Sequence, residues 1–251
     1  MKRINPAVTR AAIVLCVLVL WEINTRFSLT SRILVAPPSE IFWQVLNILA
    51  TTSNVPNFYS NAWITVQGFI GAFAVSAVLG VSLGLLFASS KLMGDAFEPI
   101  LLVLYAIPKV ILYPLFVLML GVGMAPKIIF GITVGIFVVI FNTSAAVRQI
   151  DPNYARLAYS LGYGNFLTFF KIILPAAAPT ILAGLRLGFG YTVVGVMAAE
   201  LLVVTNGLGS LIDWASFNYF TPQLYALIFI TLVIGLVGNS FFSFLERRWV
   251  K

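Results

Sequence analysis

The stretch Ala62–Ser89, which reads AWITVQGFIGAFAVSAVLGVSLGLLFAS, sets the class of this protein because no charged side chain interrupts it. A helix needs roughly 20 mostly apolar residues to cross the hydrocarbon core of a bilayer. Small residues recur every four positions here, and such stripes bring helices into close contact within membranes. We expect a spanning helix whose stripe packs inside one subunit in preference to a dimer contact. The stripe consists of Gly68, Ala72, Ser76, Gly80, Gly84 and Ala88.

The composition of the whole chain agrees with this interpretation. Of its 251 residues, 61% are hydrophobic and 9% are charged, and the mean hydropathy is +1.03, whereas soluble domains are about a quarter charged. We predict an all-α integral membrane protein in which residues 1–251 form one domain with six transmembrane helices. The predicted spans are at about residues 11–28, 62–89, 97–120, 126–147, 176–205 and 222–244, and residues 89–96 should form a short loop.

Two residue types restrict the chemistry. The chain has no histidine and one cysteine, Cys16, which argues against disulfides, metal cages of thiolate or imidazole, and histidine-dependent catalysis. No lysine lies in the Gly-x-x-x-x-Gly-Lys-Ser/Thr pattern of a phosphate loop. We therefore predict no catalytic residues, no metal ligands and no cofactor in this chain.

The formal net charge of +7 would suit nucleic acid, but basic residues in membrane proteins collect in cytoplasmic loops and report orientation. With the N-terminus inside, only Arg26, Arg32 and Lys127 of the 15 basic residues lie in outer segments, and Lys109 lies within a span. We predict that both termini lie in the cytoplasm. We also predict that the protein lies in a lipid bilayer and does not bind nucleic acid.

The connector at about residues 148–171 is the polar segment that stands out on the inner side. Asp151 can cap a helix that has Pro152 at its first position and Gly162 at its end. A second amphipathic stretch follows, and Pro175 should stop it before the fifth span begins. Such an element either straps two spans together at the cytoplasmic surface or receives another protein there.

The connector and the start of the next span carry residues whose spacing resembles the EAA-type motif of ABC importer permeases: Asp151-Pro152, Ala158, Leu161-Gly162, Ile172, Leu174-Pro175 and Pro179. In that family the motif forms the coupling helix that sits in a groove of the ATPase. One position departs from the pattern, because Arg156 stands where the motif has its glutamate. A partner ATPase should therefore differ at the matching position, or be contacted by shape around Ala158 and Gly162. The predicted ATPase-coupling residues are Asp151, Pro152, Arg156, Ala158, Leu161, Gly162, Leu174 and Pro175.

Other motifs extend the resemblance over roughly residues 10–248, and together they are similar to the nitrate/sulfonate/bicarbonate (taurine) branch of these permeases. The resemblance implies a type I ABC importer permease (MetI-like) fold with a cytoplasmic coupling helix. It also implies a separate ABC ATPase subunit that binds ATP and Mg, an extracytoplasmic solute-binding protein and a permease homodimer. The motifs are Ile107-Pro108-Lys109, Pro114-Leu115, Gly121-Val122-Gly123, Gly184-Leu185-Arg186, Ala199-Glu200 and Gly207-Leu208-Gly209.

The implied location is the bacterial or archaeal cytoplasmic (inner) membrane. The implied substrate is a small anion such as nitrate, a sulfonate such as taurine, or bicarbonate. A permease of another importer branch, for amino acids or vitamin precursors, and an ATP-independent secondary transporter remain as alternatives.

Lys109 and Glu200 are two of the ionisable residues that fall within predicted spans, where such residues are costly and tend to face a cavity or a partner. Lys109 lies between prolines that remove backbone donors which lipid cannot replace. We assign Pro108, Lys109, Pro114 and Glu200 to the translocation path, with Lys109 favouring anions. The alternative for Lys109 is a buried pair with Glu200. Glu200 suits a hydrogen-bonded anchor between helices better than a proton relay, since no second acid or histidine lies nearby in the chain.

Overall fold

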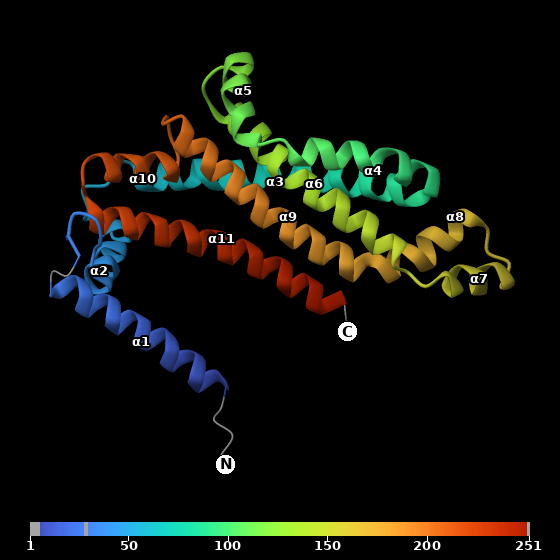
Figure 1. Cartoon of the computed structure of the whole chain (residues 1–251), viewed down its shortest axis with the longest axis horizontal. Coiled ribbons are helices and arrows are strands. Elements are labelled where there is room, and N and C mark those ends of the chain that lie inside the picture. Colours follow the sequence, from blue (N-terminus) through green and yellow to red (C-terminus); the bar gives the residue numbers. More distant parts are fainter. Residues whose placement is uncertain (1–5, 28–29, 250–251) are drawn as a thin grey trace, which may run out of the picture.

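The computed structural model describes residues 6–27 and 30–249, and every regular element in these ranges is helical, which confirms the all-α prediction. The chain runs through several long helices joined by short ones (Figure 1). The α-helices are α1 Pro6–Arg26, α2 Pro38–Leu49, α3 Phe58–Ser89, α4 Lys91–Ala106, α5 Tyr113–Leu120, α6 Met124–Arg148, α7 Pro152–Ser160, α8 Asn165–Thr168, α9 Leu174–Leu202, α10 Leu208–Phe217 and α11 Thr221–Trp249. A 3-10 helix, η1, spans Lys109–Leu112, and a π-helix, η2, spans Phe169–Ile173.

Five helices in the described residues are long and apolar enough to cross a membrane, and a sixth crossing results if α4 and α5 count as one broken span. The segments Leu92–Ala106 and Lys109–Leu120 meet at an angle of 76°. The predicted short loop at residues 89–96 is wrong, because Ser90 alone separates α3 from α4. Polar residues such as Asp95 interrupt the run of apolar residues, but the helix continues through them.

The core of the molecule is the close packing of α3, α6 and α9. A Cβ added to Gly80 would lie 2.7 Å from the Val139 Cβ, and one added to Gly84 would lie 2.6 Å from the Thr143 Cβ. The small-residue stripe of α3 therefore packs against α6 inside this chain, as predicted. In lipid, where apolar burial adds little, this close backbone approach supplies the van der Waals contact that holds helices together.

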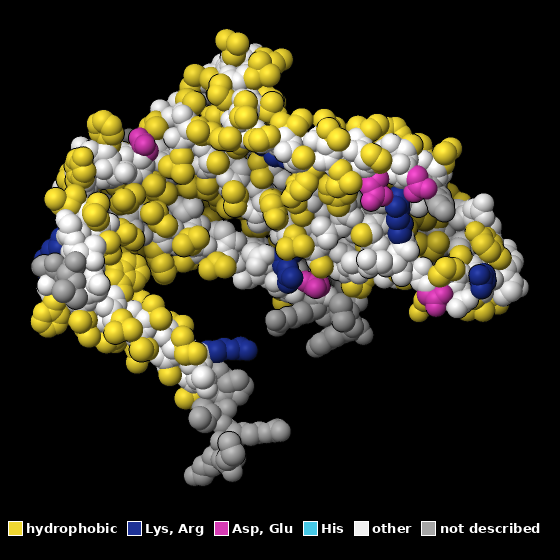
Figure 2. Space-filling view, viewed as in Figure 1, with side chains coloured by type: hydrophobic (Ala, Val, Ile, Leu, Met, Phe, Trp, Pro, Cys, Tyr) yellow, Lys and Arg dark blue, Asp and Glu magenta, His cyan; other side chains and the backbone are white. Residues whose placement is uncertain are grey.

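The remaining helices surround this core unevenly (Figure 1). α11 packs beside α9, and α10 lies between α3, α9 and α11. α1 runs away from the rest beyond its contact with α2, α5 projects from the bundle, and α7 lies at one end. Apolar side chains cover most of the face shown in Figure 2, and most of the charged side chains visible there lie towards the end that carries α7. An apolar outer surface of this kind suits lipid rather than water.

Candidate functional site

The bend between α4 and α5 carries three of the residues that were assigned to the path. α4 ends at Ala106, Pro108 has extended backbone, and η1 then leads into α5. Pro114 lies in the first turn of α5, where the N–H that proline lacks would have had no partner. Pro108 and Pro114 are both exposed in the single chain. The two prolines therefore bound a bend at the surface of this subunit.

The half-buried Lys109 side chain folds back onto the end of α4. Its ammonium group donates hydrogen bonds to the Tyr105 carbonyl oxygen and, at 3.4 Å, to the Ile107 carbonyl oxygen. The ammonium lies 4.6 Å from the ring centre of Tyr105 and 5.2 Å from that of Phe137. The unpaired carbonyls at a helix C-terminus and the faces of aromatic rings both attract a cation. A positive charge is therefore held at the bend.

The alternative pairing of Lys109 with Glu200 is wrong, because the ion-pair partner of Glu200 is Lys127. The Lys127 Nζ lies 3.8 Å from the Glu200 Oε1, and these side chains are 1% and 0% exposed. Lys127 was expected in an outer segment, yet it lies in the first turn of α6 with its side chain turned inwards. Its place inside the predicted span 126–147 was a sign of a buried partner, because lone charges in membranes are costly.

The Lys127–Glu200 pair belongs to a larger buried cluster. Lys127 donates to both the backbone and the side-chain oxygen of Asn206, at 2.6 Å each. The Glu200 carboxylate accepts hydrogen bonds from the Thr65 hydroxyl at 2.9 and 3.0 Å and from the Gly209 N–H at 2.9 Å. The cluster joins α3, α6, α9 and α10, which is the geometry of an anchor between helices.

The two glycines of the Gly207-Leu208-Gly209 motif lie against Glu200. Gly207 has φ +100°, a conformation that favours glycine, and a Cβ there would meet the Glu200 carboxylate. A Cβ on Gly209 would lie 2.5 Å from the Glu200 Cβ. The motif and Glu200 thus form one structural unit. Because Glu200 has no exposed surface in the single chain, its assignment to the path stays a prediction.

The predicted coupling segment contains a capped helix, α7. The Asp151 carboxylate accepts a hydrogen bond from the Asn153 N–H at 2.9 Å, and Pro152 occupies the first turn. At the other end Gly162 has φ +82°, the Gly162 N–H bonds to the Tyr159 carbonyl, and the Tyr163 N–H bonds to the Ala158 carbonyl. This pair of bonds is the Schellman motif. Both ends of α7 are therefore fixed by the residues that the sequence indicated.

The eight predicted coupling residues divide between the surface and the interior. The Ala158 side chain is fully buried, and Leu174 packs half-buried against the cluster of Ala146, Ala177 and Ile181. Arg156 is exposed and donates to the Asn153 side-chain oxygen at 3.3 Å. The other members exposed to solvent are Asp151, Pro152, Leu161, Gly162 and Pro175.

The expected helix stop at Pro175 is wrong. α8, η2 and α9 form one continuous helix, Asn165–Leu202. In η2 the Leu174 N–H bonds to the carbonyl of Phe169, five residues back. A proline removes one backbone donor and crowds the carbonyl four residues before it. The wider π-turn directly before Pro175 absorbs this defect, so the helix continues through the proline.

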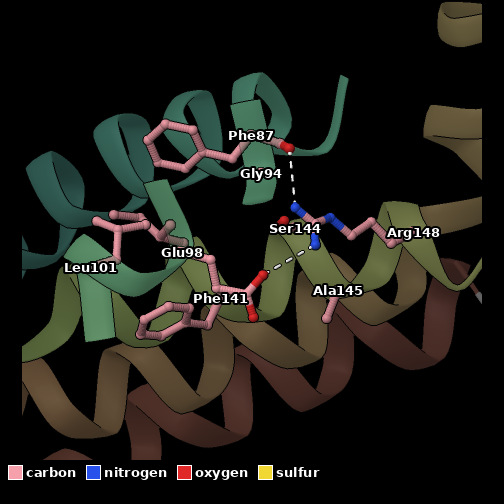
Figure 3. Close-up of a pocket in the computed structure, with 9 residues that line it drawn as sticks. Phe87, Gly94, Glu98, Leu101, Phe141, Ser144, Ala145 and Arg148 are labelled. Carbon is pink, nitrogen blue, oxygen red and sulfur yellow. Dashed lines mark hydrogen bonds and ion pairs between the residues drawn. The ribbon is translucent and has the colours of Figure 1, made fainter. Parts of the chain in front are cut away.

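A cavity of about 270 Å³ lies between α4 and α6 beside the end of α3, and the sequence did not predict it. Figure 3 shows Arg148, the last residue of α6, reaching across it. The guanidinium Nη1 lies 3.2 Å from the Glu98 carboxylate on α4, and Nη2 donates to the Phe87 carbonyl oxygen at 3.4 Å. A Cβ on Gly94 would meet the Arg148 guanidinium. Glycine at this position therefore leaves space for the arginine.

The sequence profile of the family described as binding-protein-dependent transport system inner membrane component matches residues 76–251. The chain belongs to this family. It is therefore a multi-pass membrane protein and a non-catalytic membrane component of an ABC importer. The matched region contains the broken span, the cavity, α7 and both residues of the Lys127–Glu200 ion pair.

Several relatives of this permease are named for the solute that they transport. It is 36% identical over 177 residues to the nitrate import permease of Synechocystis, a match that covers 69% of this chain and 63% of that protein. It is 26% identical to the formylaminopyrimidine transport permease of Halalkalibacterium halodurans, over 98% and 96% of the two chains. It is 28% identical to the putative aliphatic sulfonates transport permease of Bacillus subtilis, over 94% and 84%.

A solved structure shows the same fold. The inward-facing methionine ABC transporter MetNI contains a chain that superposes on this permease with a TM-score of 0.68 at 16% identity. The match covers 77% of this chain and 96% of that one. The predicted type I importer permease fold is confirmed at this level.

Proposed function

We propose that this permease forms the solute path of an ATP-driven importer for a small anion such as nitrate, taurine or another sulfonate, or bicarbonate. The observation that carries the proposal is the cation of Lys109, held at the bend of a broken span by helix-end carbonyls and aromatic rings. Such a charge attracts anions where hydrocarbon would repel them. The likeness to permeases named for nitrate and for aliphatic sulfonates supports the same substrate class.

Energy for transport comes, in this proposal, from a separate ABC ATPase subunit that binds ATP and Mg and docks on α7. Two features support α7 as the dock. Both of its ends are fixed by hydrogen bonds, and it presents exposed apolar side chains at Tyr154, Leu157 and Leu161 beside Arg156. Large apolar and aromatic side chains next to an arginine are typical of protein interfaces.

The family membership supports the following proposal for the rest of the assembly. A solute-binding protein delivers the anion at the extracytoplasmic side, two permeases form a homodimer, and both termini lie in the cytoplasm of a bacterial or archaeal cell. The apolar faces of α1 and α4, largely exposed in the single chain, leave room for a second permease and for lipid.

The direct test is co-purification of the permease with a candidate ABC ATPase, followed by reconstitution with a candidate solute-binding protein. We expect ATP hydrolysis to rise several-fold with nitrate, taurine or bicarbonate. The formylaminopyrimidine of the full-length relative should be included as a non-anionic competitor. Stimulation by that compound alone would contradict the anion proposal, and a permease without any ATPase partner would contradict the importer.

The docking role of α7 is tested by three variants. Gly162→Trp should uncouple ATP hydrolysis from uptake, because it adds bulk and strains a backbone at φ +82°. Gly162→Asn keeps the left-handed conformation accessible and should retain most coupling. Gly164→Trp adds the same bulk two residues away, where a Cβ meets no atom within 4 Å. Unchanged uptake in Gly162→Trp would remove the basis for docking at this point.

A further inference from the structure

The ion pair between Arg148 and Glu98 has no role in the function proposed above. It joins the last residue of α6 to the middle of α4, across the cavity shown in Figure 3. Only Gln149 and Ile150 separate Arg148 from Asp151, which caps α7. A displacement of α7 would therefore be passed to Arg148 across a connection of only two residues.

α4 is the helix on which such a movement would act. It packs on α3 through the Phe97 ring, which stacks on the Phe87 ring with centroids 5.2 Å apart. Near its end the Tyr105 ring meets Phe141 edge-on at 5.8 Å, and Lys109 follows at the bend. The cavity separates α4 from α6 between Gly94 and Leu101, so α4 is not packed tightly on α6 along this part. The ion pair bridges that open interval.

The cavity is shaped around the pair. A Cβ on Gly94 would lie 2.7 Å from the Arg148 Cζ and 3.0 Å from the Phe87 carbonyl oxygen. Any larger side chain at this position would displace the guanidinium from Glu98 and Phe87. Gly94, Glu98 and Phe87 therefore together accommodate the Arg148 guanidinium.

We propose that Arg148 is a positioning residue that links the ATPase dock at α7 to the broken span, by pulling on α4 through Glu98. The proposal rests on the proposed importer function, and α4 carries the movement towards Lys109, which lies eleven residues after Glu98. The ion pair acts as a tether, and the cavity gives α4 space to move relative to α6.

The chain offers a matched control in the pair of Arg186 and Glu246. It has the same residue types, an Nη1 to Oε2 distance of 3.1 Å against 3.2 Å, and a comparably exposed arginine. It joins α9 to α11 and does not touch α4. If the effect of Arg148→Gln came only from losing an arginine or an ion pair between two helices, Arg186→Gln should have the same effect.

The experiment measures the position of α4 without requiring a known solute. Spin labels at Leu92 on α4 and Val78 on α3, both exposed, are introduced into the full complex in a Cys16→Ser background. The distance between labels is measured by pulsed electron paramagnetic resonance in the nucleotide-free state and after trapping with ATP and vanadate. We expect the distance distribution to shift in the parent complex and in Arg186→Gln, and to stay fixed in Arg148→Gln.

Three further variants and a second readout complete the test. Glu98→Gln and Gly94→Ala should each abolish the shift as Arg148→Gln does, and the charge exchange Arg148→Glu with Glu98→Arg should restore part of it. Uncoupled variants should hydrolyse ATP while taking up several-fold less nitrate or taurine per ATP than the parent.

The outcomes separate the two proposals. An unshifted distance in a parent complex that traps vanadate, or a normal shift in Arg148→Gln, would overturn the tether and leave the importer intact. A parent permease that binds no ATPase would overturn the proposed function, and the tether with it.

Discussion

The three long helices α3, α6 and α9 and the broken pair α4 and α5 differ in how closely they approach their neighbours. In the first region glycines bring backbones together, and a Cβ on Gly195 would lie 2.9 Å from the Gly131 Cα. In the second region, a cavity and a few long side chains separate α4 from α6. Close-packed helices resist displacement, whereas a helix held by side-chain contacts has room to shift.

We infer from this difference that the core mainly provides stability and the broken span mainly serves transport. The buried charges of Lys127 and Glu200 hold the core together, and the exposed or half-buried charges of Lys109 and Glu98 lie on the loosely packed pair. We therefore expect substitutions in the core to reduce stability and substitutions in the broken span to reduce transport. The following predictions test that inference, from the largest expected change in stability to the smallest.

Lys127→Met should have the largest effect, because it leaves the Glu200 carboxylate buried without its cation. Removing one partner of a buried ion pair costs about 3–5 kcal/mol of stability. Thermal unfolding of the purified permease in detergent should show a lower midpoint, and Lys127→Met combined with Glu200→Gln should recover part of the loss. A single variant as stable as the parent would show that the cluster does not anchor the core.

Gly84→Val should have the next largest effect. The new Cβ would lie 2.6 Å from the Thr143 Cβ and 2.8 Å from the Ile140 carbonyl oxygen. Overpacking of this kind typically costs about 1–3 kcal/mol. The matched control is Gly190→Ala in α9, where a Cβ meets no atom within 4 Å. The control should be neutral or more stable by up to about 1 kcal/mol, because alanine is the better helix former. Equal unfolding midpoints for the two variants would contradict the close packing of α3 on α6.

Lys109→Met should have the smallest effect on stability, within about 0.5 kcal/mol, because the side chain is only half-buried and lies outside the core. Uptake at saturating substrate should nevertheless fall several-fold in a well-expressed, normally assembled complex. Lys109→Arg keeps the charge near the Tyr105 and Phe137 rings and should retain most uptake. Undiminished transport by Lys109→Met would exclude a required role for this cation.

The sequence predicted the parts of the site that depend on local rules. Asp151, Pro152 and Gly162 fix the ends of α7 because caps are made by residues next to each other in the chain. The small-residue stripe of α3 predicted close packing for the same reason, since its spacing is a property of one helix. The prolines on either side of Lys109 marked a place where backbone donors are missing, although the 76° bend between α4 and α5 was not predicted.

The partners of the charged residues could not be predicted in this way. Lys109 and Glu200 both fell inside predicted spans, yet Glu200 pairs with Lys127 and Lys109 folds back onto the end of α4. The continuation of α9 through Pro175 was missed because a π-turn is a departure from the usual hydrogen bonding of a helix. The cavity with Arg148 and Glu98 was missed because the two residues lie on different helices, 50 positions apart in the chain.

By itself the sequence determined the membrane class, the helical fold, the helix caps and the family resemblance. These depend on apolar length, on spacing within one helix and on residues adjacent in the chain. The tertiary structure alone decided which charges meet, where α4 separates from α6, and why glycine is required at Gly94 and Gly207. Such contacts depend on the positions of helices in space, and a periodic apolar pattern does not specify which neighbour each helix face will meet.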